Sequence, residues 1–160
     1  MNDWKPELDA IVGARHGGAG EAVASRLRAL DGKYPNVPEI VLQLAWSLEI
    51  SGKQEEALAA YDKALSLGLS PNEHAAALLG LANCQRLCGD AAKAIKTLRE
   101  GLALFPDNRE FDAHLGIALH QAGHYAEAVR TLITVLVETS EDAGIRAYQR
   151  SLRHQAAQLK

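Results

Sequence analysis

The chain has 160 residues and a formal net charge of −3, a length that suits about one domain with its own hydrophobic core. The slight negative charge argues against nucleic-acid binding, and no apolar run approaches the roughly 20 residues that span a membrane. Alanine and leucine are plentiful, and Val, Ile and Thr form no alternating runs, so the composition predicts an all-α protein.

The first predicted elements are two helices within residues 3–35. Gly17 separates them, and Ala22 follows this glycine by five residues. The apolar residues at helical spacing are Leu8, Ile11 and Val12 in the first helix, and Val23, Leu27 and Leu30 in the second. We expect a degenerate helix pair here, because the same glycine-to-alanine spacing recurs further along the chain.

Three glycines, Gly52, Gly89 and Gly123, mark the same position in three similar segments. Glycine ends a helix cheaply because it accepts left-handed backbone. The spacing therefore predicts three antiparallel helix pairs, in which small residues let the two helices of a pair approach closely. The matching positions are Leu44, Leu81 and Leu115; Ala45, Ala82 and Gly116; Ala57, Ala94 and Ala128; Tyr61, Leu98 and Leu132. We place the pairs at residues 38–71, 72–106 and 107–140.

Each pair also begins with a capping signal. The segments NVPE from Asn36, SPNE from Ser70 and DNRE from Asp107 place a glutamate three residues after a capping residue. In a capping box the first side chain and the glutamate satisfy each other's backbone N–H groups. We expect all three boxes to form.

A closing helix is predicted over residues 141–158, with Ile145, Tyr148 and Leu152 facing the repeats. Arrays of helix pairs need such a helix because each internal pair buries its faces only on its neighbours.

The repeated unit resembles the tetratricopeptide repeat, a helix-turn-helix of 34 residues. The segments AWSLEISGKQEEALAAYDKALSLGL, ALLGLANCQRLCGD and LREGLALFPDN resemble, more narrowly, the small bacterial group-five tetratricopeptide proteins. The resemblance covers about residues 38–140, although Ser140 stands where the family has a proline. It implies a right-handed superhelix of antiparallel helix pairs, an α-solenoid, and suggests a homodimer.

In such a superhelix the first helix of each pair lines the concave side. The residues expected there are Glu39, Leu42, Trp46, Glu49 and Ile50; Ala76, Leu79, Asn83, Arg86 and Leu87; Glu110, Ala113, Ile117, His120 and Gln121; and Trp4, Glu7, Ile11 and Arg15. The candidate partner-binding residues chosen from this set are Trp46, Glu49, Leu79, Asn83, Arg86, Ile117 and His120.

Asn83 is the most informative member of this set. Its amide can pair with the N–H and C=O groups of an extended peptide, and Arg86 one turn on could take a carboxylate. An asparagine at this position often holds peptide backbone in the resembled family. Two pairs of alternatives stay open: Asn83 and Arg86 either bind a peptide or simply face solvent, and Trp46 is either a groove residue or a core residue between repeats.

We expect no catalytic residue, no cofactor and no metal site. His120 and His124 are four residues apart, but Gly123 interrupts the helix between them. Cys84 and Cys88 lie on one helix face, where a disulfide is geometrically unfavourable, so two small thiols are expected.

Some members of the resembled family hold the C-terminal carboxylate of chaperones with a clamp of lysines, asparagines and an arginine. The matching positions here hold Leu42, Trp46, Gly80, Glu110 and His114. Because none of these is a lysine or an arginine, we expect no binding of this kind.

The leading hypothesis is a non-catalytic protein-protein interaction module, or adaptor, that binds a peptide or protein segment in its concave groove. The alternative is a self-associating structural protein that assembles as a homodimer through the apolar residues Leu132, Val135, Leu136 and Ile145. The first residues, MNDWKPELDA, lack a basic and then apolar signal pattern, so a cytoplasmic location is expected.

Overall fold

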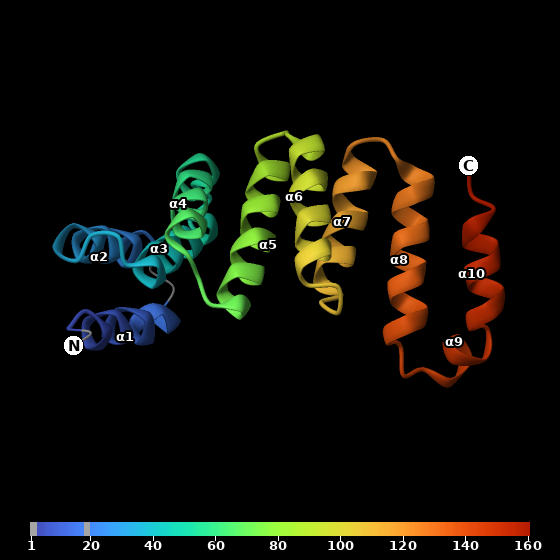
Figure 1. The fold of residues 1–160 in the computed structure, drawn as a ribbon, viewed down its shortest axis with the longest axis horizontal. Helices are drawn as coiled ribbons and strands as arrows, with labels where there is room; N and C mark the ends of the chain where they lie inside the picture. Colours follow the sequence, from blue (N-terminus) through green and yellow to red (C-terminus); the bar gives the residue numbers. More distant parts are fainter. Residues whose placement is uncertain (1–2, 18–19) are drawn as a thin grey trace. The chain divides into compact units, whose positions relative to one another are not determined.

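The computed structural model describes residues 3–17 and 20–160, and the regular elements in these ranges are all helices (Figure 1). The predicted all-α fold of helix pairs is therefore confirmed. Contacts divide the chain into two compact units with a boundary between Cys88 and Gly89, and each unit is described by itself. The N-terminal unit holds α1 (Lys5–Gly13), the short 3₁₀ helix η1 (Ala14–Gly17), α2 (Gly20–Lys33), α3 (Pro38–Ile50), α4 (Gln54–Leu67) and α5 (Pro71–Leu87). The C-terminal unit holds α6 (Ala91–Leu104), α7 (Glu110–Gln121), α8 (Tyr125–Thr139), α9 (Ala143–Ala147) and α10 (Gln149–Ala157).

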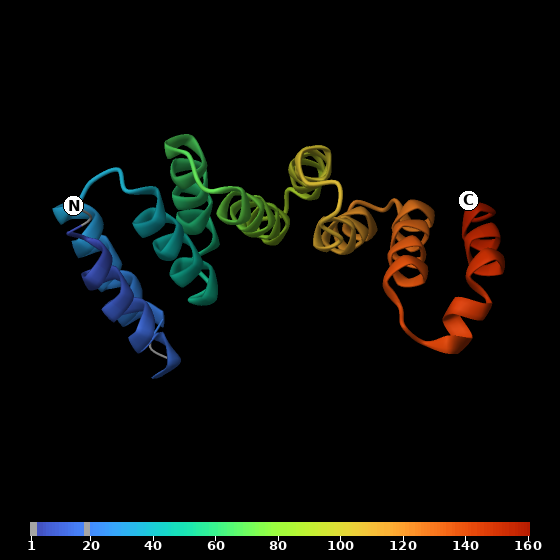
Figure 2. The same ribbon diagram turned by 60° about the horizontal axis from the view of Figure 1, so that its bottom comes forward.

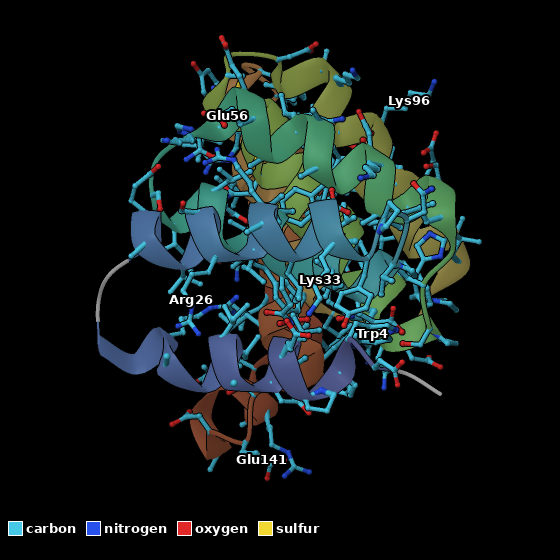
Figure 3. The ribbon with its side chains drawn as sticks, turned by 90° about the vertical axis from the view of Figure 1, so that its left-hand side faces the viewer. Trp4, Arg26, Lys33, Glu56, Lys96 and Glu141 are labelled. Atoms are coloured by element: carbon cyan, nitrogen blue, oxygen red, sulfur yellow. The ribbon has the colours of Figure 1, made fainter. Side chains whose placement is uncertain are left out.

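In the N-terminal unit each helix packs against the next one along the chain, from α1 to α5. The degenerate pair predicted at residues 3–35 is formed by α1 and α2, and residues 18 and 19 of this range lie outside the described residues. Lys33 lies on the side of α2 that faces α1 (Figure 3), and its Nζ is 2.6 Å from Glu7 Oε1. The Tyr34 hydroxyl donates a hydrogen bond to the same Glu7 oxygen at 2.9 Å.

In the C-terminal unit α6 packs on α7, α7 on α8, and α8 on α10. The chain turns back at α9, so that α10 runs beside α8 (Figure 2). The prediction of a single closing helix over residues 141–158 was wrong. Two helices replace it because Asp142 caps a separate short helix, accepting a hydrogen bond from Ile145 N at 2.9 Å, and Tyr148 leaves helical geometry at φ −96° and ψ 6°.

The three turn glycines adopt the predicted left-handed backbone, with φ of 75° at Gly52, 91° at Gly89 and 85° at Gly123. At the first of these turns, Lys53 N donates to Leu48 O at 2.9 Å and Gly52 N donates to Glu49 O at 3.0 Å. This is the Schellman pattern, which satisfies carbonyl groups at the end of a helix. The glycines therefore end α3, α5 and α7 for the reason predicted.

Small residues bring the two helices of a pair together, as the spacing predicted. Ala57 and Ala128 are buried in the first turns of α4 and α8. A Cβ built on Gly116 of α7 would lie 2.6 Å from Leu132 Cδ2 of α8, too close for any real contact. The side chain of Leu132 thus occupies the space that Gly116 leaves open.

Only one of the three predicted capping boxes forms among the described residues. At the start of α5, Ser70 N donates to Glu73 Oε2 at 3.3 Å, and the Ser70 hydroxyl donates to the same oxygen. The box predicted at Asn36 is absent, because Asn36 adopts a left-handed φ of 63° and Val37 becomes the N-cap of α3. The box predicted at Asp107 is also absent, since Arg109 precedes α7 as its N-cap.

Candidate functional site

Glu49, near the end of α3, joins three helices of the N-terminal unit through its carboxylate. One oxygen accepts a hydrogen bond from the Tyr61 hydroxyl of α4 at 2.5 Å, and the other accepts from Asn83 Nδ2 of α5 at 2.7 Å. Arg86 Nη2 in turn donates to Asn83 Oδ1 at 2.8 Å. Three of the predicted binding residues, Glu49, Asn83 and Arg86, therefore form one polar network with Tyr61. We call these four residues the Glu49 network.

The amide of Asn83 is engaged at both ends in this structure. Its nitrogen donates to Glu49 and its oxygen accepts from Arg86, which is a use that the sequence did not predict. An amide nitrogen carries two hydrogens and an amide oxygen has two lone pairs. Asn83 is half-buried, so one donor and one acceptor position remain for a further partner.

The protonation of this network follows from burial. Desolvation, and then the hydrogen bond to the Glu49 carboxylate, raise the pKa of Tyr61 far above its usual value, so its hydroxyl remains a donor. Burial also raises the pKa of the Cys84 thiol to about 12, with a smaller contribution from Glu49. Cys84 Sγ donates to Gln54 Oε1 at 3.2 Å. Such a thiol is protonated at neutral pH and is a poor nucleophile.

The predicted residues Trp46 and Leu79 lie on α3 and α5, the helices that also carry Glu49 and Asn83. Trp46 is partly buried and packs against the core of the N-terminal unit, and its role in binding a partner stays a prediction. Leu79 is also half-buried. Two further residues were expected on the concave face, but Leu42 and Ile11 are buried in the core instead.

Arg15 has an unusual environment at the start of the same unit. Its Nη2 donates to Gln43 Oε1 at 2.7 Å and to Ser47 Oγ at 3.2 Å, while its Nε is buried without a hydrogen-bond partner. Desolvation lowers the pKa of this guanidinium. Among the residues that the structure describes, no carboxylate forms an ion pair with it. A small cavity of about 70 Å³ lies between Arg15 and the exposed Ile50.

Sequence reasoning missed Gln43 and Ser47 as partners of Arg15. Both lie on α3, four residues apart, and Glu39 precedes Gln43 by the same spacing. That polar spacing was visible in the sequence. The contact itself depends on how η1 sits against α3, which the sequence does not specify.

The remaining predicted residues, Ile117 and His120, lie on α7 in the C-terminal unit. Both side chains are exposed. The His120 ring contacts the Tyr125 ring edge to face, with centroids 5.1 Å apart. These two residues form a separate candidate surface, because they belong to the other unit.

No group of three or more His, Cys, Asp or Glu side chains in residues 3–17 and 20–160 is arranged to hold a metal ion. Over the same ranges, no helix combines the length and apolar character that crossing a bilayer requires.

Comparison with protein families gives a match over residues 38–159 to a family model described as "Tetratrico peptide repeat". This match confirms the resemblance predicted from the sequence. No curated protein sequence matches the chain at a significant level.

Several solved structures share the fold. A structure of MamA residues 41 to the end, from Desulfovibrio magneticus RS-1, has a TM-score of 0.76 and 17% identity, covering 98% of this chain and 91% of that one. The structure described as "YrrB: a TPR protein with an unusual peptide-binding site" has a TM-score of 0.69 and 13% identity, covering 97% and 79%. A structure of Naa15/Naa10 bound to HypK-THB has a TM-score of 0.63 and 17% identity, covering 96% of this chain and 23% of that one.

Proposed function

The chain belongs to the tetratricopeptide-repeat family, and on that premise we propose that it is a non-catalytic adaptor that binds a peptide or protein segment. The observation that carries the proposal is the Glu49 network. It gathers hydrogen-bonding groups from α3 and α5 at one half-buried place and keeps an unused donor and acceptor on Asn83. The peptide-binding site attributed to YrrB supports the proposal by analogy of fold alone.

An extended segment would bind here through its backbone. Its C=O and N–H groups would pair with the free positions of the Asn83 amide, which matches the alternation of donors and acceptors along a peptide. Arg86 adds a positive charge one turn along α5, and Leu79 adds apolar surface one turn before. The exposed Ile50 and Leu87, at the ends of α3 and α5, would contact apolar side chains of the partner.

The non-catalytic part of the proposal is supported by the chemistry of the buried thiol. The raised pKa of Cys84 keeps it protonated and hydrogen-bonded to Gln54, and this does not suit a nucleophile. Cys84 and Cys88 are both free, which fits a reducing compartment such as the cytoplasm. We also propose that no chaperone-type carboxylate clamp operates, since Leu42 is buried and Glu110 has the wrong charge.

Affinity capture from the native cytoplasm, read by mass spectrometry, tests the proposal. The bait variants are the wild type, Asn83→Ala/Arg86→Ala, and the control Glu55→Ala/Asp62→Ala, which changes exposed residues of α4. We expect the wild type and the control to capture the same partner and the first variant to lose it.

Circular dichroism must show that the Asn83→Ala/Arg86→Ala variant melts like a folded helical protein. If that folded variant still captures the partner, the Glu49 network is not the binding site. The parallel variant Ile117→Ala/His120→Ala tests the separate candidate surface on α7 in the same way.

Self-association is the second candidate function. The observation that favours it is a set of exposed apolar side chains on α8, which includes Leu132 and Leu136. Of the other residues expected to take part, Val135 and Ile145 are only half-exposed. Light scattering of the purified chain tests this candidate, since a monomer has a mass of 17.2 kDa.

A further inference from the structure

Arg15 lies in η1, at the end of the first helix of the degenerate pair, and neutral groups hold its guanidinium in place. Its Nη2 donates to Gln43 Oε1 at 2.7 Å, to Ser47 Oγ at 3.2 Å and to Gln43 O at 3.4 Å. Both partners lie on α3, where the buried Ser47 hydroxyl itself donates to Gln43 O at 3.0 Å. The guanidinium is therefore oriented by the protein before any ligand binds.

The positive charge of Arg15 has no counter-charge within the chain. No carboxylate of residues 3–17 and 20–160 forms an ion pair with it, and the four residues outside these ranges are Met, Asn, Gly and Ala, which have no side-chain carboxylate. Every other lysine and arginine is exposed, is paired with a carboxylate, or, as Arg86, belongs to the Glu49 network. Proteins normally pair a charge that they bury in part, and departures from this rule concentrate at functional sites.

An unused donor of Arg15 is buried in the same place as a cavity. The Nε atom is buried and has no hydrogen-bond partner. The cavity has a volume of about 70 Å³ and is lined by Arg15, Gly20, Val23, Ser47 and Ile50. One water molecule needs about 10–15 Å³, so the cavity has room for a small functional group.

The lining of this cavity selects a small ligand with one negative charge. Guanidinium groups bind carboxylates through several N–H donors at once. Arg15 is the one charged residue of the lining, which matches the single charge of a carboxylate better than the larger charge of a phosphate group. Val23 and Ile50 provide apolar contact for the carbon atoms next to the carboxylate.

The place of Arg15 in the repeat puts this cavity beside the surface proposed for the partner. Arg15, Ile50 and Leu87 each stand two residues before a turn glycine, so they occupy equivalent positions in three consecutive helix pairs. Ile50 is 71% exposed and Leu87 is 49% exposed. A segment that contacts these two apolar side chains and continues toward η1 therefore reaches the charge of Arg15.

We propose that Arg15 binds a carboxylate of the partner segment, next to apolar residues of that segment that contact Ile50 and Leu87. The site rests on the adaptor function proposed above, and it names the chemistry that the adaptor selects. It is distinct from the chaperone-type clamp, because Arg15 stands at none of the positions that correspond to that clamp.

The first test uses sodium acetate as the carboxylate probe and the Nε–H signal of Arg15 in nitrogen NMR spectra as the readout. Arg15→Lys lacks this signal and so identifies it. We expect acetate to shift the signal saturably, whereas sodium chloride at equal ionic strength should not. The Nε–H signal of the exposed Arg26 is the control and should respond equally to both salts. Equal responses at Arg15 would mean that the cavity holds water only, and would overturn the proposal.

The second test selects peptides from a random displayed library. The baits are the wild type, Arg15→Glu, and the matched control Arg26→Glu, which makes the same charge change at an exposed position of the same unit. The wild type and the control should enrich peptides with Asp or Glu near apolar residues. Arg15→Glu should bind those peptides at least about tenfold more weakly and should enrich lysine or arginine instead.

The variant Arg15→Gln removes the charge without reversing it, so it should lose the acidic preference and gain no basic one. Circular dichroism must show that each bait is folded. Two changes to an enriched peptide distinguish the sources of the carboxylate. Replacing Asp or Glu by its amide abolishes binding if the carboxylate is a side chain, and amidating the C-terminus abolishes it if the carboxylate is the chain end.

The outcomes separate this site from the adaptor function on which it rests. If the wild type enriches peptides without an acidic preference, and Asn83→Ala/Arg86→Ala loses them, the adaptor function stands and the Arg15 site does not exist. Folded Arg15 variants that keep the acidic peptides would also overturn the site. If the wild type enriches no peptide at all, both proposals fail.

Discussion

At the scale of single residues, Glu49 links three helices of the N-terminal unit, and the sequence around it does not indicate this. Its carboxylate accepts hydrogen bonds from Tyr61 and Asn83, which come from two other helices. Hydrogen bonds to a charged acceptor are stronger than those between neutral groups. The same residues that make the candidate site therefore also hold α3, α4 and α5 in register.

Removing this acceptor should destabilise the fold. We expect Glu49→Leu to lower the free energy of unfolding by about 1–3 kcal/mol, because the Tyr61 hydroxyl and the Asn83 amide would lose their acceptor while half-buried or buried. Glu49→Gln keeps one carbonyl oxygen and should lose less. Urea denaturation of both variants checks the order, with Glu55→Gln on the exposed face of α4 as control. Equal losses in the two Glu49 variants would contradict the role of the carboxylate.

The two cysteines should differ sharply in reactivity. Cys88 is exposed, whereas Cys84 is buried and its pKa is raised to about 12. At about pH 8 a thiol reagent should therefore label one cysteine in the folded protein and two in urea. The variant Cys88→Ser should show no fast labelling before unfolding. Fast labelling of two thiols in the folded wild type would contradict the burial of Cys84.

The same pKa shift predicts a pH dependence of stability. The pKa of the Cys84 thiol is about 12 in the folded protein and returns toward its ordinary value of 9.0 on unfolding. At a pH between these two values, the unfolded protein therefore releases a proton that the folded protein keeps. The free energy of unfolding should be unaffected by this group below about pH 9 and should fall as the pH rises toward 12. Tyr61, whose pKa is also raised, acts in the same direction. Urea unfolding at about pH 8 and about pH 10 measures the fall.

At the scale of the helices, the glycine turns can be tested by substitution. Gly52→Ala and Gly123→Ala force a left-handed backbone on alanine and should each cost about 1–2 kcal/mol of unfolding free energy. Gly32→Ala is the matched control, because Gly32 lies in α2 with nothing within 4 Å of the added Cβ. Alanine is the better helix former, so this control should gain about 0.5–1 kcal/mol. Thermal melts of the three variants check the opposite signs.

The helix boundaries show what a sequence can specify. The turns at Gly52, Gly89 and Gly123 were predictable because a positive φ is a local requirement that glycine meets. The capping boxes at Asn36 and Asp107 were not, since each cap competes with neighbouring residues for the first helical position.

The faces of the helices were harder to predict than their ends. Leu42 was placed in the groove because α3 is apolar almost all round, with seven buried residues that leave its polar face poorly marked. The Glu49 network could not be predicted, because it depends on the register of three helices. The second apolar face of α8 is visible in the sequence, since the apolar residues Ile133 and Val137 stand where α4 has the polar residues Asp62 and Ser66.

At the scale of the whole molecule, stability should vary along the chain. Each helix pair of a repeat protein is held by its neighbours, so terminal elements with one neighbour open more easily. We expect the slowest amide exchange in α3 and α4, which hold many fully buried residues, and the fastest in α9, which has five residues and none buried. Hydrogen exchange read by mass spectrometry tests this order. Uniform protection from α3 to α9 would contradict it.

The position of α10 also bears on how such a chain can lengthen. Because α10 rests on a face of α8 that is polar in α4 and α6, it leaves free the face on which an added helix pair would stack. A duplicated repeat inserted before α9 could then pack directly on this free face of α8. The helices α9 and α10 could follow the added repeat without a change in their own sequence. The feature that leaves apolar side chains of α8 exposed in the present protein is thus also what makes the array extensible by duplication.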